Sequence, residues 1–120
     1  MQIAIQRAYD APTAKDGHRV LVDRLWPRGI SKDKLKIDAW YKDVAPSTEL
    51  RQWFAHDPER WTEFRQRYRK ELAAPALQQR LRGLLQETGR RNLTLIYSAH
   101  DTEHNQAVVL REVLKELLPV

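Results

Sequence analysis

The sequence predicts a single α/β domain over residues 1–120, with a small mixed, largely parallel sheet that helices cover on both faces. Two runs of aliphatic and β-branched residues, His18–Asp23 and Leu93–Tyr97, are typical of strands buried on both faces. Between them lie segments whose apolar residues recur at helical spacing. Strands that alternate with helices favour parallel pairing, and 120 residues suit one domain.

The first third of the chain contains two further strand candidates and one short helix. Gln2–Ile5 alternates between polar and apolar residues, as a first strand does. The segment Trp26–Gly29 holds a proline and a glycine, which break regular structure. Ser31 can cap a single helical turn over Lys32–Leu35, and Ile37–Tyr41 is a weaker strand candidate.

Three helices are expected next, beginning near Ser47, at the Asp57-Pro58 pair, and at Pro75. We expect their apolar stripes to face the core; an aromatic platform for stacked bases is the less favoured interpretation. These stripes comprise Leu50, Trp53 and Phe54, then Trp61, Phe64, Tyr68 and Leu72, then Leu77, Leu81, Leu84 and Leu85. A final helix is expected from about Glu103 to Leu118, after the Leu93–Tyr97 strand.

Composition excludes several function classes. The chain has no cysteine, which excludes disulfides, thiolate catalysis and thiolate-rich metal sites. Its N-terminus has no apolar h-region typical of a signal peptide, and no apolar run approaches the roughly 20 residues that span a bilayer. We therefore expect a cytoplasmic protein with no membrane partner. No nucleotide-binding glycine loop is present and no cofactor is predicted.

The net charge of +5 is concentrated in the middle third of the chain. Arg51–Arg91 contains ten basic and five acidic residues, whereas the remainder carries eleven of each sign. Such an excess can attract a nucleic acid without reading its sequence. The interpretation that we favour is the solvated outer face of two helices.

Three long motifs carry a family resemblance. The stretches Arg19–Gly29, Ala45–Tyr68 and Leu93–Leu110 resemble, in the same order, the YeaO-like branch of the domain-of-unknown-function family 488. The resemblance covers nearly the whole chain and implies a compact α/β domain, but no particular activity, because none is established for the family. Some longer relatives have cysteines where this chain has Tyr97 and Asn105, so no thiol-based role is implied here.

Polar residues follow the two most hydrophobic strands, where ligands bind in open α/β sheets. After the first strand, Arg24 and Arg28 suit bidentate recognition of phosphate or carboxylate. Asp23 could act as a base or hold one of these arginines. Trp26 is either core packing or an aromatic wall for a ligand.

The second polar segment follows the last strand. Ser98, Asp101 and Asn105 are candidates for orienting a ligand, and the exposed N–H groups of a helix start favour an anion. Asp101 or Thr102 is the expected N-cap of the last helix. His104 is either a general acid/base near neutral pH or a hydrogen-bonded residue of the core or rim.

Two sharper site types fit poorly. His100 and His104 have the i, i+4 spacing of a helical zinc motif, but Asp101 occupies the position of its glutamate and His100 precedes the expected helix. His100 also stands where the YeaO-like branch has a lysine. A nucleophilic triad through Ser98 lacks the G-x-S-x-G turn. No metal site is predicted.

The leading hypothesis is a site for an anionic small molecule, either an enzyme using acid/base chemistry or a binding domain. Asp23 and His104 would transfer protons, and Arg24 and Arg28 would bind the anion. Weaker candidates for ligand contact are Lys42, Arg51, Arg7 and Tyr9. The alternative is a nucleic-acid-binding module that uses the arginine-rich middle third. The reaction, the ligand and the oligomeric state are left open.

Overall fold

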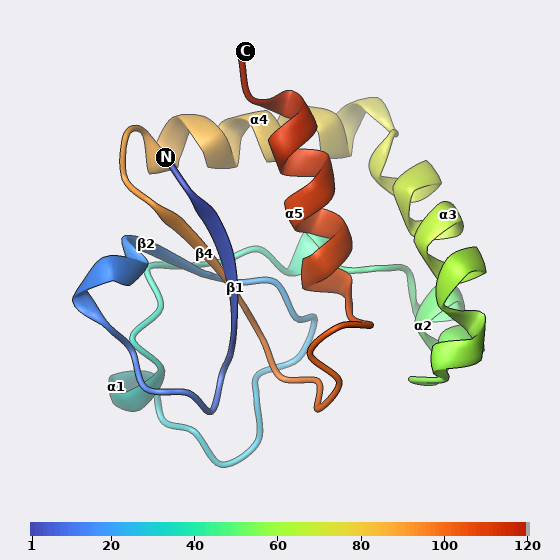
Figure 1. Cartoon of the computed structure of the whole chain (residues 1–120), viewed down its shortest axis with the longest axis horizontal. Coiled ribbons are helices and arrows are strands. Elements are labelled where there is room, and N and C mark those ends of the chain that lie inside the picture. Colours follow the sequence, from blue (N-terminus) through green and yellow to red (C-terminus); the bar gives the residue numbers. More distant parts are fainter. Residues whose placement is uncertain (120) are drawn as a thin grey trace.

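Four parallel strands form one sheet in the order β1-β4-β2-β3 in a computed structural model that describes residues 1–119 (Figure 1). The strands are β1 (Ile3–Arg7), β2 (His18–Leu21), β3 (Ala39–Trp40) and β4 (Leu93–Tyr97). Both long apolar runs become the central strands β2 and β4, as their sequences predict. The α/β class is confirmed, and every strand pair in the described sheet is parallel.

The two faces of the sheet carry cores of different size. Val20 and Leu95 point into a large cluster that the longer helices cover. Leu21 and Ile96, one residue further along each strand, point into a smaller cluster on the opposite face. All four side chains are fully buried, because successive residues of a strand face opposite sides and both sides are covered.

Helices lie on both faces, as expected, but the coverage is unequal. Residues of α2, α3, α4 and α5 contribute to the large cluster, whereas the single turn α1 places Leu35 in the small one (Figure 1). The helices are α1 (Lys32–Leu35), α2 (Thr48–Phe54), α3 (Trp61–Leu72), α4 (Pro75–Thr88) and α5 (Gln106–Leu117). No helix within residues 1–119 is both long and apolar enough to cross a membrane.

Several predicted caps are confirmed. The Ser31 hydroxyl accepts a hydrogen bond from the Lys34 N–H at the start of α1, and Ser47 accepts one from Leu50 at the start of α2. Asp57 also caps, but it opens a 3-10 turn over Pro58–Arg60 that leads into α3. Two further 3-10 turns, Ala14–Asp16 and Lys42–Val44, were not predicted.

The prediction for the start of the last helix was wrong. The helix α5 begins at Gln106, and its N-cap is Asn105, whose side chain accepts from the Val108 N–H. Asp101 instead accepts from the backbone N–H groups of Glu103 and His104 and closes a separate turn. Residues 101–105 offer several capping side chains, so local sequence alone did not identify the cap that begins the helix.

The start of β2 depends on Gly17. Its φ of 67° favours glycine, and an added Cβ would lie 2.2 Å from the Asn92 carbonyl oxygen, just before β4. The neighbouring His18 N–H donates to that same oxygen at 2.8 Å. The two central strands therefore approach closely at their amino ends, and their parallel register places their carboxyl ends side by side at the other end of the sheet.

Candidate functional site: a cationic cleft at the strand ends

A cleft of about 980 Å³ lies beyond the carboxyl ends of β2 and β4. The loop after β2 forms one wall, the loop after β4 forms another, and α2 contributes a third. Most of the predicted site residues line it together: Asp23, Arg24, Trp26, Arg28, Arg51, Ser98, Asp101 and Asn105, with the weaker candidates Arg7 and Tyr9.

The carboxylate of Asp23 holds these walls together. Its Oδ2 accepts hydrogen bonds from the Ser98 N–H at 3.0 Å and the Ser98 hydroxyl at 2.5 Å. Its Oδ1 accepts from the Gln106 side-chain amide at the start of α5. Asp23 thus connects the ends of both central strands to the last helix.

Burial dominates the electrostatics of Asp23, whose exposed fraction is 7%. Burial raises the pKa of its carboxyl above the usual 3.8, against the opposing effects of the donors on Ser98 and Gln106 and of the nearby His56 side chain. Within the described residues no arginine or lysine lies within 4.0 Å of this carboxylate. Neither Arg24 nor Arg28 is therefore held by Asp23, and the carboxylate serves as a structural acceptor.

Four arginines border the cleft: Arg7, Arg24, Arg28 and Arg51. Within residues 1–119, none of them has a carboxylate oxygen within 4.0 Å, although arginines on α3 and α4 do. The Nε atom of Arg51 is buried and has no hydrogen-bond partner there. Arg24 and Arg28 are exposed. A group of guanidiniums without counter-charges is suited to an anion.

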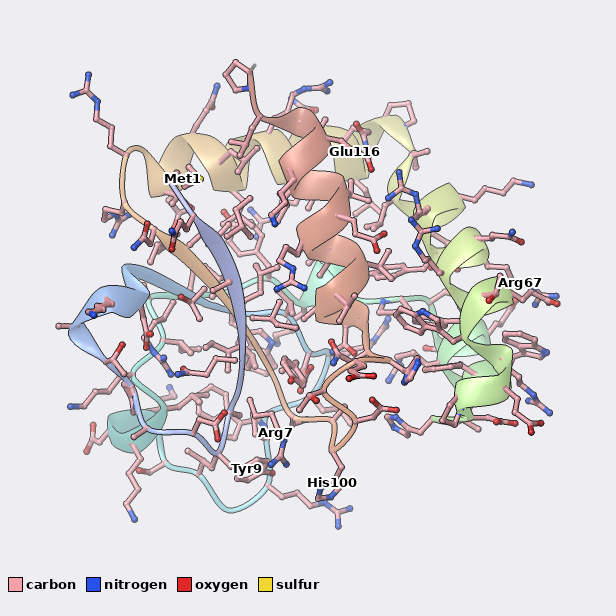
Figure 2. The ribbon with its side chains drawn as sticks, viewed as in Figure 1. Met1, Arg7, Tyr9, Arg67, His100 and Glu116 are labelled. Carbon is pink, nitrogen blue, oxygen red and sulfur yellow. The ribbon has the colours of Figure 1, made fainter. Side chains whose placement is uncertain are left out.

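Arg7, Tyr9 and His100 form one end of the cleft, where they lie close together (Figure 2). The Arg7 guanidinium lies 5.1 Å from the centre of the Tyr9 ring and 3.5 Å from His100 Nδ1, and its Nε donates to the Ala99 carbonyl. The Tyr9 hydroxyl donates to the Arg28 carbonyl at 3.1 Å. These contacts connect the end of β1 to both loops.

Two predicted site residues lie outside the cleft lining. His104 packs edge-on against Trp61 of α3, with ring centres 5.3 Å apart, and its Nδ1 lies 2.9 Å from the Asp101 carboxylate. Lys42 lies over the Trp40 ring at 4.2 Å. The Ser98 hydroxyl donates to Asp23 rather than to His104, so the described structure does not assemble a triad through these residues.

Asp101 and Asn105 line the cleft but also stabilise its second loop. Backbone N–H groups of Glu103 and His104, with the His104 side chain, lower the pKa of the Asp101 carboxyl below its usual 3.8. Asn105 is buried, caps α5, and donates to the Asp101 carbonyl at 2.9 Å. The side chains of Asp101 and Asn105 therefore already hydrogen-bond within the loop, and a ligand would have to share these groups with their local partners.

Sequence reasoning missed His56 and Gln106, which both line the cleft. Gln106 is placed by its bond to Asp23, which only the tertiary fold reveals. His56 follows α2 with a φ of 56°, directly after Ala55 with a φ of 46°. Two consecutive non-glycine residues in the left-handed region are uncommon, and such strain clusters at functional sites. No glycine or asparagine in the sequence signalled this turn.

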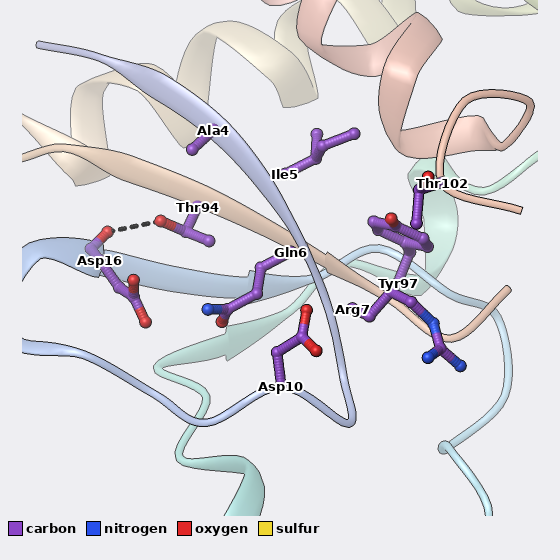
Figure 3. Close-up of a pocket in the computed structure, with 9 residues that line it drawn as sticks. All are labelled: Ala4, Ile5, Gln6, Arg7, Asp10, Asp16, Thr94, Tyr97 and Thr102. Atoms are coloured by element: carbon purple, nitrogen blue, oxygen red, sulfur yellow. Dashed lines mark hydrogen bonds between the residues drawn. The ribbon is translucent and has the colours of Figure 1, made fainter. Parts of the chain in front are cut away.

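A second hollow, of about 420 Å³, lies along β1 at the edge of the sheet (Figure 3). Several of the polar groups there have partners within the chain: the Thr94 hydroxyl donates to the Asp16 carbonyl, and Arg19 Nη1 donates to the side chains of Asp16 and Gln6 at 2.6 Å each. No cluster of three potential metal ligands occurs within residues 1–119. The cleft at the strand ends is larger and gathers most of the predicted site residues, so it is the candidate site.

Comparisons with known proteins agree with the sequence motifs. The family model described as "Inactive DUF488-N3 subclade" matches residues 2–119. The chain is 44% identical over 117 residues to the uncharacterized protein YeaO of Escherichia coli, covering 98% of this chain and all of that protein. It is 43% identical over 113 residues to an uncharacterized protein of Mycobacterium tuberculosis, covering 94% and 93% of the two chains. No solved structure gives a significant match.

Proposed function

The chain belongs to the DUF488 family, in its inactive DUF488-N3 subclade, and from this premise we propose that its cleft binds a small anionic ligand without converting it. The observation that carries the proposal is the set of four cleft arginines that have no carboxylate partner among residues 1–119. A phosphate or carboxylate could accept bidentate hydrogen bonds from them. The two carboxylates that line the cleft, Asp23 and Asp101, are already engaged by the chain's own donors.

Binding without turnover is favoured over acid/base catalysis because the candidate proton carriers are poorly placed. Asp23 accepts hydrogen bonds at both oxygens from Ser98 and Gln106, which leaves little freedom for it to act as a base. His104 lies against Trp61, outside the cleft lining. His56 borders the cleft, but among the described residues no hydrogen bond joins its ring to a hydroxyl, and the Ser98 hydroxyl donates to Asp23 instead. The word "inactive" in the description of the subclade agrees with this assignment.

The nucleic-acid alternative receives less support. Five of the ten basic residues between Arg51 and Arg91 form ion pairs with carboxylates. These five are Arg60, Arg65, Arg67, Arg69 and Arg80. Paired in this way, they leave a weaker field for a polyanion. A steep loss of affinity for a DNA or RNA oligonucleotide with added salt would favour this alternative instead.

The test is a thermal-shift and calorimetric screen of inorganic phosphate, pyrophosphate and citrate at low ionic strength. A ligand at 100 times its Kd stabilises the folded state by about 2.7 kcal/mol, so the Tm of the wild type should rise with ligand concentration. Arg24→Ala/Arg28→Ala should lose this response. The matched control is Arg82→Ala, which removes an exposed arginine on α4 away from the cleft. No response of the wild type to any anion, or an equal response of the double variant, would contradict the proposal.

A further inference from the structure

One side of the cleft is apolar and rigid. Trp26 borders it from the loop after β2, beside Leu25 and Pro27. The Trp26 indole N–H donates to the Ile30 carbonyl at 2.7 Å, and the ring packs edge-on against Trp40 with centres 5.6 Å apart. These two contacts fix the ring before any ligand arrives, so the wall needs little ordering on binding.

An apolar residue at the mouth extends this wall. Leu25 has an exposed fraction of 73%, the largest among the exposed large hydrophobic residues of the described chain. Leu25, Trp26 and Pro27 lie between Arg24 and Arg28, so an apolar run is flanked by cationic groups along one short loop. Phe54, from α2, contributes a further aromatic side chain to the lining. A ligand with both an anionic and an apolar part would match this arrangement.

The charge of the cleft specifies the anionic part. The lining of the cleft contains four arginines and two carboxylates, those of Asp23 and Asp101. With the histidines neutral, this leaves an excess of two positive charges. A phosphomonoester carries about −1.5 to −2 at pH 7, whereas a single carboxylate carries one negative charge. The phosphomonoester therefore balances the cleft more closely.

The size of the cleft argues against a bare anion. Its volume of about 980 Å³ lies within the range of sites that enclose a drug-sized molecule. A water molecule occupies about 30 Å³ of liquid, so an inorganic phosphate would leave room for many waters against the apolar wall. Burying that wall under a planar group would release this water and add stacking contacts.

We infer that the ligand is a phosphomonoester carried by a planar aromatic group, as in an aryl phosphate or a nucleotide. The arginines bind the phosphate and the wall around Trp26 receives the ring. The inference rests on the proposed function, since it specifies the class of anion that the same cleft takes.

Wild-type protein alone tests the inference, through calorimetric titrations with phenyl phosphate, methyl phosphate and benzoate at pH 7.5 and low salt. Stacking on an aromatic side chain corresponds to roughly a tenfold or larger gain in affinity, so phenyl phosphate should bind at least that much more tightly than methyl phosphate. Equal Kd values for the two esters would overturn the aromatic assignment and leave anion binding intact. Benzoate binding as tightly as phenyl phosphate would overturn the phosphate assignment. Failure of all three to bind would remove the proposed function as well.

Variants of Trp26 test whether the aromatic ring of the ligand binds against this side chain. Trp26→Ala should lose roughly tenfold in affinity for phenyl phosphate but not for methyl phosphate, whereas Trp26→Phe should retain most of the difference. Trp53→Ala is the matched control, because Trp53 lies outside the cleft under Arg60 and Arg67. An unchanged ratio of the two Kd values in folded Trp26→Ala would overturn the role of this wall. Should Trp26→Ala not fold, the wild-type titrations still decide the inference.

Discussion

Asp23 accepts hydrogen bonds from both the backbone N–H and the hydroxyl of Ser98, at 3.0 and 2.5 Å. Because Asp23 follows β2 and Ser98 follows β4, this pair joins the carboxyl ends of the two central strands. Gln106 donates to the same carboxylate and brings the start of α5 into the contact. The shape of the cleft therefore depends on the buried carboxylate of Asp23. The contribution of its hydrogen bonds to the free energy of unfolding can be measured.

Removing either partner should destabilise the protein, and the two effects should be coupled. A hydrogen bond to a charged group contributes about 1.5–3 kcal/mol, so Asp23→Ala should lower the free energy of unfolding by about 2 kcal/mol and Ser98→Ala by about 1 kcal/mol. In urea denaturation the double variant should lose less than the sum of the two. Asp10→Ala, which removes an exposed carboxylate, is the control and should stay near the wild type. Strict additivity would show that the pair does not act as described.

The same carboxyl should titrate abnormally. Burial raises its pKa above the usual 3.8, although Ser98, Gln106 and His56 favour the charged form. The folded protein then holds the proton more tightly than the unfolded chain, so this group's stabilisation is complete below pH 3.8 and is lost as pH rises through the folded pKa. NMR titration of the Asp23 carboxyl carbon should give a midpoint above 3.8, and a higher one in Ser98→Ala. A wild-type midpoint at or below the usual value would be the contrary result.

Much of the fold follows from local sequence. The side chains of Ser31 and Ser47 accept hydrogen bonds from backbone N–H groups. Each serine caps the helix that was predicted to begin after it. The limits of β4, Leu93–Tyr97, match the apolar run because that strand is buried on both faces. The start of α5 could not be located in this way. Asp101, Thr102 and Asn105 can each serve as an N-cap, and tertiary contacts determine which of them begins the helix.

The position of the cleft was predictable from the sequence, but the details of its lining were not. Ligands bind beyond the carboxyl ends of parallel strands, and this rule identified the two loops that line the cleft. It could not show that His104 turns toward Trp61 while its neighbour Asn105 turns inward, because that depends on how the loop packs against α3. Nor could it find His56, which reaches the cleft through a left-handed turn after α2.

Arg51 should strengthen ligand binding without stabilising the folded protein. Its buried Nε lacks a partner within the described residues, and an unsatisfied buried donor costs about 1–3 kcal/mol. Arg51→Met should therefore leave the free energy of unfolding unchanged or raise it by about 1 kcal/mol, while weakening phosphate binding by roughly tenfold. Urea denaturation and calorimetry measure the two quantities. Destabilisation together with unchanged affinity would indicate a purely structural role.

The turn after α2 stores strain that glycine should relieve. Ala55 has a φ of 46°, in the left-handed region, where a Cβ costs roughly 1–2 kcal/mol. Ala55→Gly should therefore stabilise the protein by about 1 kcal/mol in thermal or urea unfolding. Ala73, at the corresponding position after α3, has a φ of −75°, so Ala73→Gly should destabilise it slightly. Loss of stability in both variants would contradict this explanation.

The most direct test of the cationic cleft is a backbone-amide NMR titration of the wild type with phenyl phosphate. If the cleft is the binding site, saturable shifts should appear in the loops Arg24–Arg28 and Ser98–Asp101 and around Arg51, which line it. The amides around Arg82, Arg90 and Arg91 should stay unchanged, because these residues lie outside it. Saturable shifts confined to that second group, or no saturable shift at all, would contradict the assignment of the cleft as an anion site.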